Sequence, residues 1–390
     1  MVGNDFTLGE LLGLWVEDDL IGGKLATGTV NNYMSTVRTL QRLPIGARPA
    51  ADITTEELEA FLETAMTDRI GADGRVVRGY SRSHILSFSA VLHHAFRFAL
   101  RRGLVERDPA CQMGVPSTPA CGFDMFEGCG GSARRRTEAL GVGGRMLSTR
   151  ASSAAGGTVS HATYLRICDR FRETNNAALL PVQISYYTGL RLGEVCALLW
   201  DDVNLRGGWL DVRRSLTLNR IHDSFLEFTP PKRNHARRVF FGDTLRAILQ
   251  QAREQQAVRA ACGTAMANYC VPFDDAGKLR YRLESLAARE EVPAGWRRLD
   301  LVCTRADGSF ENRRTLASAC YRVRDKVPGA EGFHFHQLRH AYTTNLIAAK
   351  VSPKTVQELL GHNDIATTMN VYAHTNARSL RRAARALDKL

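Results

Sequence analysis

The sequence predicts a mainly α fold with a small antiparallel sheet (α+β) and more than one domain. Apolar residues recur at helical spacing along most of the chain, which indicates amphipathic helices. Two short segments near the middle, residues 207–219 and 237–242, have instead the aromatic and β-branched content of strands. A chain of 390 residues is long enough for two or three domains, each with its own core.

Residues 5–115 are predicted to form a helical unit. Within residues 29–43 the apolar side chains fall at helical spacing: Val30, Tyr33, Met34, Val37, Leu40 and Leu43. A second helix begins with Thr54 and Glu57 at capping-box spacing, and its apolar stripe continues through Leu58, Phe61, Leu62 and Ala65. The third helix, over residues 81–103, stops at Gly103 and is expected to turn inward Ile85, Leu86, Leu92, Ala95, Phe96 and Ala99. His93 and His94 on this helix are interpreted as surface or packing residues.

Residues 116–157 interrupt the regular pattern. They are dense in Gly, Ser, Ala and Arg and have little apolar periodicity, which predicts a linker or a disordered insertion. The run Arg134 to Arg136 is either a solvated charge cluster or a contact to DNA phosphate, and both interpretations stay open.

Residues 158–376 are predicted to form a second, mainly helical domain. Helices are expected within residues 159–174, 176–204 and 243–261, with the two strand-like segments between the last two. Residues 262–300 are interpreted as irregular. Three more helices are expected within residues 336–350, 352–361 and 364–374, where Ser352 caps the second helix, Pro353 occupies its first turn and Gly361 ends it.

Composition and charge restrict the class of function. Fifty-two Lys and Arg against 40 Asp and Glu give a formal net charge of +12, which favours a polyanionic partner such as nucleic acid. No stretch approaches the roughly 20 consecutive apolar residues of a membrane span, and the acidic N-terminus lacks the features of a signal peptide. We therefore expect a cytoplasmic protein without membrane contact. Nine scattered cysteines, none in a CxxC pair, indicate reduced thiols rather than a disulfide framework.

A metal site is not expected. His336 and His340 have the spacing of a zinc-binding helix, but Gln337 stands where a zinc protease needs a glutamate, and no third ligand is evident. Cys121 and Cys129 lack partner histidines at zinc-ligand spacing. The sequence thus predicts neither a metal nor another cofactor.

Several separated residues suit attack on a phosphodiester. Arg191 follows a glycine turn with Glu194 three residues later, and His336 and Arg339 share one helical face. A guanidinium can hold two nonbridging phosphate oxygens at once, and a histidine can assist a tyrosine whose pKa is ordinarily about 10. His362 lies ten residues before Tyr372, and Lys232, between two strand-like segments, could protonate a leaving hydroxyl. The alternatives are that Arg191 is only a solvated residue at the edge of its helix and that Tyr372 is only a buried packing residue.

Three motifs in order resemble those of the tyrosine recombinases, or phage-type integrases. They are "TGLRLGE" at residues 188–194, "HQLRH" at 336–340 and "LLGHNDIATTMNVYAH" at 359–374. The resemblance implies a catalytic domain over residues 158–376 and, more loosely, a helical core-binding domain over residues 5–115. The linker of about forty residues and the long stretch 262–298 depart from the family's usual pattern. The early start of the helical unit suggests that no separate arm-binding domain precedes it.

The resemblance implies a role for each motif residue. Tyr372 would be the nucleophile, and Arg191 and Arg339 the phosphate clamp. His336 would assist proton transfer, and His362 would bond the scissile phosphate. Lys232 would be the general acid, and Glu194 would orient Arg191. His340 and His374 are interpreted as supporting or structural residues.

The resemblance also implies an activity and partners. The chain is expected to be a site-specific DNA recombinase of a mobile element that cuts and rejoins duplex DNA through a covalent 3′-phosphotyrosine. Alternatives are a chromosome or plasmid dimer-resolving recombinase, a type IB topoisomerase and a noncatalytic DNA-binding protein. Paired duplex sites, a homotetramer on DNA and an excisionase-like directionality factor are the expected partners. Residues 377–390 are expected to form a basic helix that is exchanged between subunits or packs on its own domain.

Overall fold

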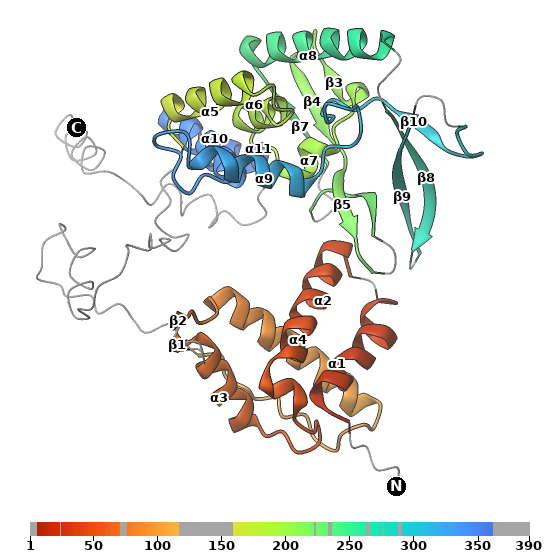
Figure 1. The fold of residues 1–390 in the computed structure, drawn as a ribbon, viewed down its shortest axis with the longest axis vertical. Helices are drawn as coiled ribbons and strands as arrows, with labels where there is room; N and C mark the ends of the chain where they lie inside the picture. The colour runs from red at the N-terminus through yellow and green to blue at the C-terminus, as the bar shows by residue number, and fades with distance from the viewer. Residues whose placement is uncertain are drawn as a thin grey trace, which may run out of the picture. The chain divides into compact units, whose positions relative to one another are not determined.

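The chain forms two compact units, each with its own apolar core (Figure 1). One unit comprises Met1–Ser148 and Asn219–Asp223, and the other Thr149–Leu218 and Ser224–Leu390. The structure is a computed structural model that describes residues 6–23, 25–70, 76–116, 159–221, 224–232, 236–262, 266–275, 277–287 and 291–361. In these ranges no helix is both long and apolar enough to cross a bilayer.

The first unit is a helical bundle with a short two-stranded ribbon. Its core is built around Trp15, Phe88 and Phe96, which the helices enclose on all sides. The side chain of Thr54 accepts a hydrogen bond from the backbone N–H of Glu57, which is one half of the predicted capping box, whereas the Glu57 carboxylate pairs with Arg48 instead. The elements are α1 (Leu8–Trp15), a π-helical turn (Val16–Leu20), α2 (Thr27–Arg42), a 3₁₀ turn (Pro44–Ala47), α3 (Thr55–Met66), β1 (Arg69–Ile70), β2 (Val76–Val77) and α4 (Arg82–Arg101).

Leu86 and His94 of α4 test two predictions made from the sequence. The prediction that Leu86 turns inward is wrong, because Leu86 is 48% exposed. The buried stripe of α4 runs through Ile85, Phe88 and Leu92, and Leu86 lies about 100° round the helix from Ile85. His94 packs in parallel over Trp15 with ring centroids 6.0 Å apart, which supports its interpretation as a packing residue.

The second unit contains most of the helices expected from the sequence. The predicted helical stretch 176–204 is divided, because Gly189 adopts φ +66° and ends α6 in a left-handed turn. Ser352, Pro353 and Gly361 begin and end α11 as predicted. The elements are α5 (His161–Glu173), α6 (Leu179–Thr188), α7 (Leu192–Cys196), a 3₁₀ turn (Trp200–Asp202), α8 (Asp243–Ala261), α9 (Arg313–Arg324), α10 (His336–Ala348) and α11 (Pro353–Leu360).

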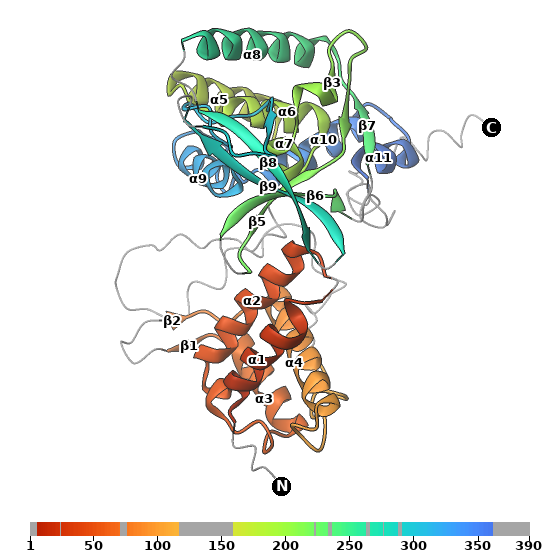
Figure 2. The same ribbon diagram turned by 90° about the vertical axis from the view of Figure 1, so that its right-hand side faces the viewer.

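Two antiparallel sheets accompany these helices (Figure 2). A three-stranded sheet has β4 in the middle and a five-stranded sheet has the order β10-β8-β9-β6-β5. In the first, Leu210 of β4 pairs with Val239 of β7, and both side chains are buried. The strands are β3 (Val203–Asn204), β4 (Trp209–Val212), β5 (Ser215–Asn219), β6 (Phe225–Thr229), β7 (Arg237–Phe240), β8 (Ala267–Asp275), β9 (Lys278–Leu286) and β10 (Arg297–Leu299).

The prediction that residues 262–300 are irregular is wrong. They contain β8 and β9, which pair over their whole length, and β10, which pairs with β8. The sequence of β9 largely alternates charged and apolar residues, which is the pattern of a strand, but its charged residues, among them the buried Arg280, hide the sheet from a search for apolar strands. Cys270 and Leu283 pair across the ribbon and are both buried, which attaches it to the core.

Candidate active site

The turn between α6 and α7 positions Arg191. Gly189 ends α6, and Arg191 itself is the extended residue that precedes the first turn of α7. Glu194, in that first turn, accepts hydrogen bonds from the backbone N–H and from Nη1 of Arg191, both at 2.9 Å. The Glu194 side chain is 1% exposed, whereas that of Arg191 is 28% exposed. The carboxylate therefore fixes one edge of the guanidinium while part of that side chain still faces solvent.

A second arginine, Arg237, binds the same carboxylate. Its Nη1 and Nη2 donate to Oε1 and Oε2 of Glu194 at 3.1 and 2.8 Å, which is a bidentate ion pair. Its Nε donates to the backbone oxygen of Leu359 at 3.1 Å. Burial alone would raise the pKa of Glu194, but the hydrogen bonds and charges of Arg237 and Arg191 lower it to about 2. Glu194 is therefore ionised throughout the neutral range.

The helix α10 brings Arg339 to the same place. Arg339 is buried, and its Nη1 and Nη2 donate to the backbone oxygens of Gly189 and Leu360, both at 2.6 Å. Burial and the charge of Arg191 lower the pKa of Arg339 to about 9. The guanidinium thus connects the turn before Arg191 to the end of α11.

Histidines lie beside the arginines. His336 and His340 are one helical turn apart on α10, with ring planes nearly perpendicular and centroids 4.9 Å apart. Although His336 keeps an exposed surface, partial burial and the charges of His340, Arg339, His334 and Arg191 lower its pKa to about 4. Burial and neighbouring charge lower the pKa of His340 in the same way. Both imidazoles are therefore neutral at pH 7 in the free protein.

The charges of this group do not balance. Three arginines, Arg191, Arg237 and Arg339, lie near one carboxylate, Glu194, and the charge of Arg191 acts on both His336 and Arg339. Like charges at close range raise the free energy of the site until an anion enters. The arrangement can therefore bind a phosphate group and stabilise additional negative charge on it.

The structure brings Arg191, Glu194, His336 and Arg339 together, but not every expected residue. Lys232 is exposed and lies between β6 and β7, which belong to different sheets rather than to one. In the described part of the chain, no hydrogen bond or ion pair joins Lys232 to the arginines or histidines. The expected sites at His362, Tyr372 and His374, and the helices expected at 364–374 and 377–390, lie outside the described residues.

Arg237 is the residue of this group that sequence reasoning missed. The alternation of side chains between the two faces of a strand is a sequence signal that could have indicated a buried position for Arg237. Arg237 and Val239 share a face of β7, and Val239 is buried, so an arginine on that face needs a buried partner. Arg238 points the other way and forms an exposed ion pair with Asp211.

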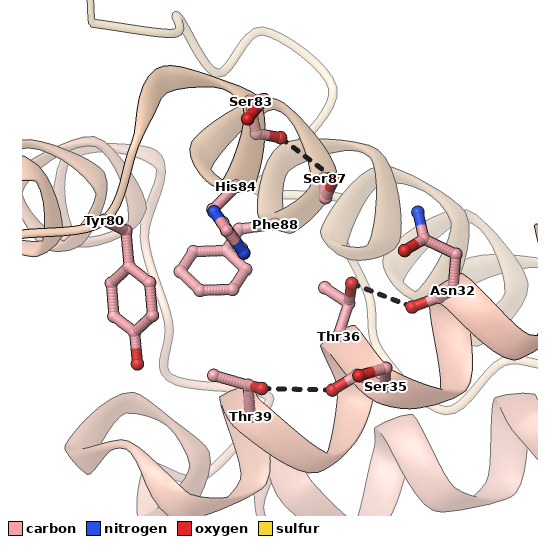
Figure 3. Close-up of a pocket in the computed structure, with 9 residues that line it drawn as sticks. All are labelled: Asn32, Ser35, Thr36, Thr39, Tyr80, Ser83, His84, Ser87 and Phe88. Atoms are coloured by element: carbon pink, nitrogen blue, oxygen red, sulfur yellow. Dashed lines mark hydrogen bonds between the residues drawn. The ribbon is translucent and has the colours of Figure 1, made fainter. Parts of the chain in front are cut away.

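A polar hollow in the first unit is a separate feature. It measures about 440 Å³ and lies between α2 and α4 (Figure 3). Three of its hydroxyls, those of Thr36, Thr39 and Ser87, already donate to backbone oxygens of their own helices. None of its lining residues is an arginine, lysine or carboxylate, so it lacks the charges found in the second unit. The lining residues are Asn32, Ser35, Thr36, Thr39, Tyr80, Ser83, His84, Ser87 and Phe88.

The residues around Arg191 suit an anion rather than a metal ion. Among the residues that the structure describes, no group of three or more His, Cys, Asp or Glu side chains could hold a metal ion. His336 and His340 share a helical turn, but the groups that act on them are cations. The group is thus suited to an anion.

Comparison with known proteins identifies the family. The sequence pattern of the phage integrase family matches residues 160–379, more than half of the chain. The chain belongs to the phage integrase family. This match contains all three motifs found in the sequence and confirms the prediction of a tyrosine recombinase.

Individual relatives agree with this family assignment. A tyrosine recombinase XerC-like protein of Caldanaerobacter subterraneus subsp. tengcongensis is 26% identical over 215 residues, which cover 53% of this chain and 48% of that protein. The ICEBs1 integrase of Bacillus subtilis is 24% identical over 207 residues, which cover 53% of this chain and 47% of that protein. The match thus spans about half the length of each relative.

A solved structure supports the fold. The integrase of the transposon Tn1549, in complex with a circular intermediate DNA, has a TM-score of 0.63 with this structure and 15% sequence identity. The superposition covers 98% of this chain and 99% of that chain. The prediction of a mainly helical α+β recombinase fold is therefore confirmed.

Proposed function

We propose that this integrase family member is a site-specific recombinase that cuts and rejoins duplex DNA through a covalent 3′-phosphotyrosine at Tyr372. The observation that carries the proposal is the excess positive charge of Arg191, Arg237 and Arg339 over the one ionised carboxylate near them, Glu194, with the neutral imidazole of His336 beside them. Its last attachment, from Arg339 to the oxygen of Leu360, lies two residues before His362. The segment that carries Tyr372 therefore begins at the cluster.

The chemistry follows from the properties of these groups. The phenolic oxygen of Tyr372 attacks the scissile phosphorus, and the bond from phosphorus to the 5′ oxygen breaks. Arg191 and Arg339 neutralise the charge that grows on the nonbridging oxygens as phosphorus becomes five-coordinate. His336, neutral at pH 7 because its pKa is about 4, accepts or relays the phenolic proton. The phosphotyrosine retains the energy of the broken bond, so that a free 5′ hydroxyl can reverse the step.

Two roles rest on sequence alone, those of His362 and Lys232. We assign His362 to a hydrogen bond with the scissile phosphate and Lys232 to protonation of the departing 5′ oxygen. Lys232 is exposed three residues after the end of β6. Glu194 holds Arg191 in place by the two hydrogen bonds described above.

The biological context is assigned to a mobile element. Both the ICEBs1 integrase and the Tn1549 integrase carry the names of such elements, and this chain is similar to both. The XerC-like relative supports the second candidate, a dimer-resolving recombinase. We expect the protein to act in the cytoplasm and an excisionase-like factor to set the direction of the reaction.

We assign a tetramer to the strand-exchange complex. Two duplexes contain four strands, and each strand is cut by one tyrosine. Residues 377–390 have leucines and alanines at near-helical spacing with arginines between them, which suits a helix passed to the neighbouring subunit. Removal of the residues after Asn376 should leave cleavage of single sites intact and abolish recombination of paired sites, measured by gel mobility of joined products.

Covalent capture tests the proposed chemistry. The probe is a nicked duplex library with a randomised centre, from which DNA that stays attached to the denatured protein is recovered and sequenced. We expect the wild-type chain to enrich one inverted-repeat sequence and Tyr372→Phe to capture none. A type IB topoisomerase would instead relax supercoiled plasmid without enriching a paired site. A wild-type chain that binds duplex DNA yet captures none would refute the enzyme.

A further inference from the structure

Arg237 lies where three distant segments of the second unit meet. From the start of β7 it reaches Glu194 in α7 through a two-pronged ion pair and the oxygen of Leu359 in α11 through Nε. Its side chain is only 9% exposed. Glu194, which Arg237 binds, also holds Arg191.

The hydrogen bonds of Arg237 argue against direct contact with DNA. The single N–H of Nε is used by Leu359, and both terminal nitrogens are directed at the two oxygens of Glu194. A buried guanidinium held on three sides cannot turn to a phosphate without breaking its two-pronged ion pair with the buried carboxylate of Glu194. Any effect of Arg237 on catalysis therefore passes through its neighbours.

One such neighbour is Glu194. The side chain is buried, which by itself raises its pKa, and the hydrogen bonds and charge of Arg237 are the largest of the opposing causes. Without Arg237, the carboxyl keeps Arg191 as its remaining cationic partner and becomes easier to protonate. A protonated Glu194 loses the charge that holds the guanidinium of Arg191.

The other neighbour is the end of α11. The last carbonyls of a helix have no partner within the helix, and here Arg237 and Arg339 bind those of Leu359 and Leu360. Gly361 then turns in the left-handed region, with φ +62°. A Cβ at Gly361 would lie 3.2 Å from Cδ of Arg237, so this turn is packed directly on the arginine. The chain continues from it to His362.

We infer that Arg237 is a positioning residue for DNA cleavage, which fixes Arg191 through Glu194 and fixes the end of α11 at Leu359 to Gly361. The inference rests on the proposed function, because it concerns the rate of the tyrosine attack. It distinguishes two arginines that are adjacent in the sequence. Arg237 is nearly buried and binds residues of two other segments, whereas Arg238 is exposed and, among the residues that the structure describes, pairs with Asp211 and the face of Trp209.

The test compares these two arginines in the full-length chain. The probe is the duplex enriched by covalent capture with the wild-type chain, and the readouts are the single-turnover rate of covalent attachment and the dissociation constant of the duplex. Arg237→Gln should slow attachment about 100-fold, the size of effect that misplacement of catalytic groups produces. Its affinity for the duplex should stay within about threefold of wild type, because the side chain does not touch DNA. Arg238→Gln, the matched control, should attach at the wild-type rate.

The pH profile separates positioning from a general loss of structure. In the wild-type chain Glu194 is ionised at all pH values above its pKa of about 2, so it adds no slope between pH 5 and 8. In Arg237→Gln the pKa of Glu194 is higher, and the rate should therefore rise with pH over this range. Glu194→Gln should be slow without this slope, and addition of Arg237→Gln to it should cause little further loss.

Arg237→Lys covers the case in which the glutamine variant does not fold. Lysine keeps the charge near Glu194 but cannot form the fork or reach Leu359 as well. We expect a rate about 10-fold below wild type with no new dependence on pH. Equal rates for the Arg237 and Arg238 variants, or a loss confined to DNA affinity, would overturn the inference. A wild-type chain that captures no DNA would instead overturn the proposed function.

Discussion

Glu194 shows how a single side chain organises the candidate active site. It is an acidic residue inside a positive cluster, yet it accepts hydrogen bonds from two arginines and from the backbone of Arg191. An isolated buried carboxylate would be costly, and pairing on both oxygens offsets that cost. The hydrogen bonds of Glu194 also orient Arg191. The same bonds that stabilise the fold therefore hold the Arg191 guanidinium in place to bind a phosphate.

Glu194 should make stability depend on pH. Its pKa is about 2 in the folded chain against an ordinary value of 4.5, so the contribution is present above about pH 4.5 and is lost as pH falls towards 2. A shift of this size corresponds to about 3 kcal/mol of unfolding free energy. We expect the difference in unfolding free energy between wild type and Glu194→Gln to shrink as pH falls from 6 to 3.

Urea unfolding in a Trp15→Phe background measures this difference. The remaining tryptophans, Trp200, Trp209 and Trp296, all belong to the second unit, so their fluorescence reports that unit alone. Asp243→Asn is a suitable control, because Asp243 pairs with Arg246 at the surface and its side chain is 96% exposed. A difference for Glu194→Gln that does not change with pH would contradict the ionised, double-paired carboxylate.

The sequence allowed some of these residues to be predicted and not others. Arg191 with Glu194, and His336 with Arg339, lie three residues apart, so each pair could be placed together from helix geometry. Arg237 reaches Glu194 from 43 residues away in the sequence, and only the pairing of β7 with β4 brings it there. Spacing within one element cannot predict a contact of that kind.

At the scale of elements, the turn at Gly189 joins α6 to the site. Its φ of +66° is a conformation that glycine adopts without strain, and its backbone oxygen accepts from Arg339 at 2.6 Å. A Cβ at this position would lie 2.5 Å from Cδ1 of Tyr342 and 3.0 Å from Cδ2 of Leu360. Both the conformation and the space at this turn therefore require glycine.

Gly189→Ala should destabilise the second unit more than alanine at an open glycine. Gly295 has φ +86° with no atom within 4 Å of an added Cβ, so Gly295→Ala should cost only about 1 kcal/mol for the backbone. The clash at Gly189 should add about 1–3 kcal/mol. The fluorescence assay described above measures both variants, and equal losses would show that Tyr342 and Leu360 do not restrict the turn.

Helices were more predictable than strands for a physical reason. A helix such as α11 carries its own signals, with Ser352 accepting from Thr355 N–H at the start and Gly361 turning at the end. The ribbon of β8 and β9 is held by partners from other strands, and its buried Arg280 pairs with Glu227 of β6 at 3.5 Å. From the sequence alone, an arginine in a strand is expected to be solvent-exposed, because its buried partner is not known.

At the scale of the whole molecule, charge and function agree. The net charge of +12 exceeds what the cluster at Arg191 contributes, so further basic residues are available for the DNA backbone. Contacts with phosphates release counterions, and affinity then falls steeply with salt. The two units have separate cores, and each can supply its own part of a DNA-binding surface.

Affinity for a 30-bp duplex of arbitrary sequence should therefore depend on salt. We expect at least about a tenfold loss between 50 and 200 mM NaCl, measured by fluorescence anisotropy. Arg238→Gln should retain the slope within error if its ion pair with Asp211 keeps it from the phosphates. Affinity that does not change with salt would show that the positive charge is not used for DNA.

The most direct measurement of the central claim is to map the protein–DNA linkage by mass spectrometry. Trypsin should release residues 355–378 as one peptide, in which Tyr372 is the only tyrosine. After capture of the enriched duplex and nuclease digestion, we predict that this peptide carries a nucleotide on Tyr372 through its 3′ phosphate. A nucleotide found on any other residue, or joined through a 5′ phosphate, would contradict the account.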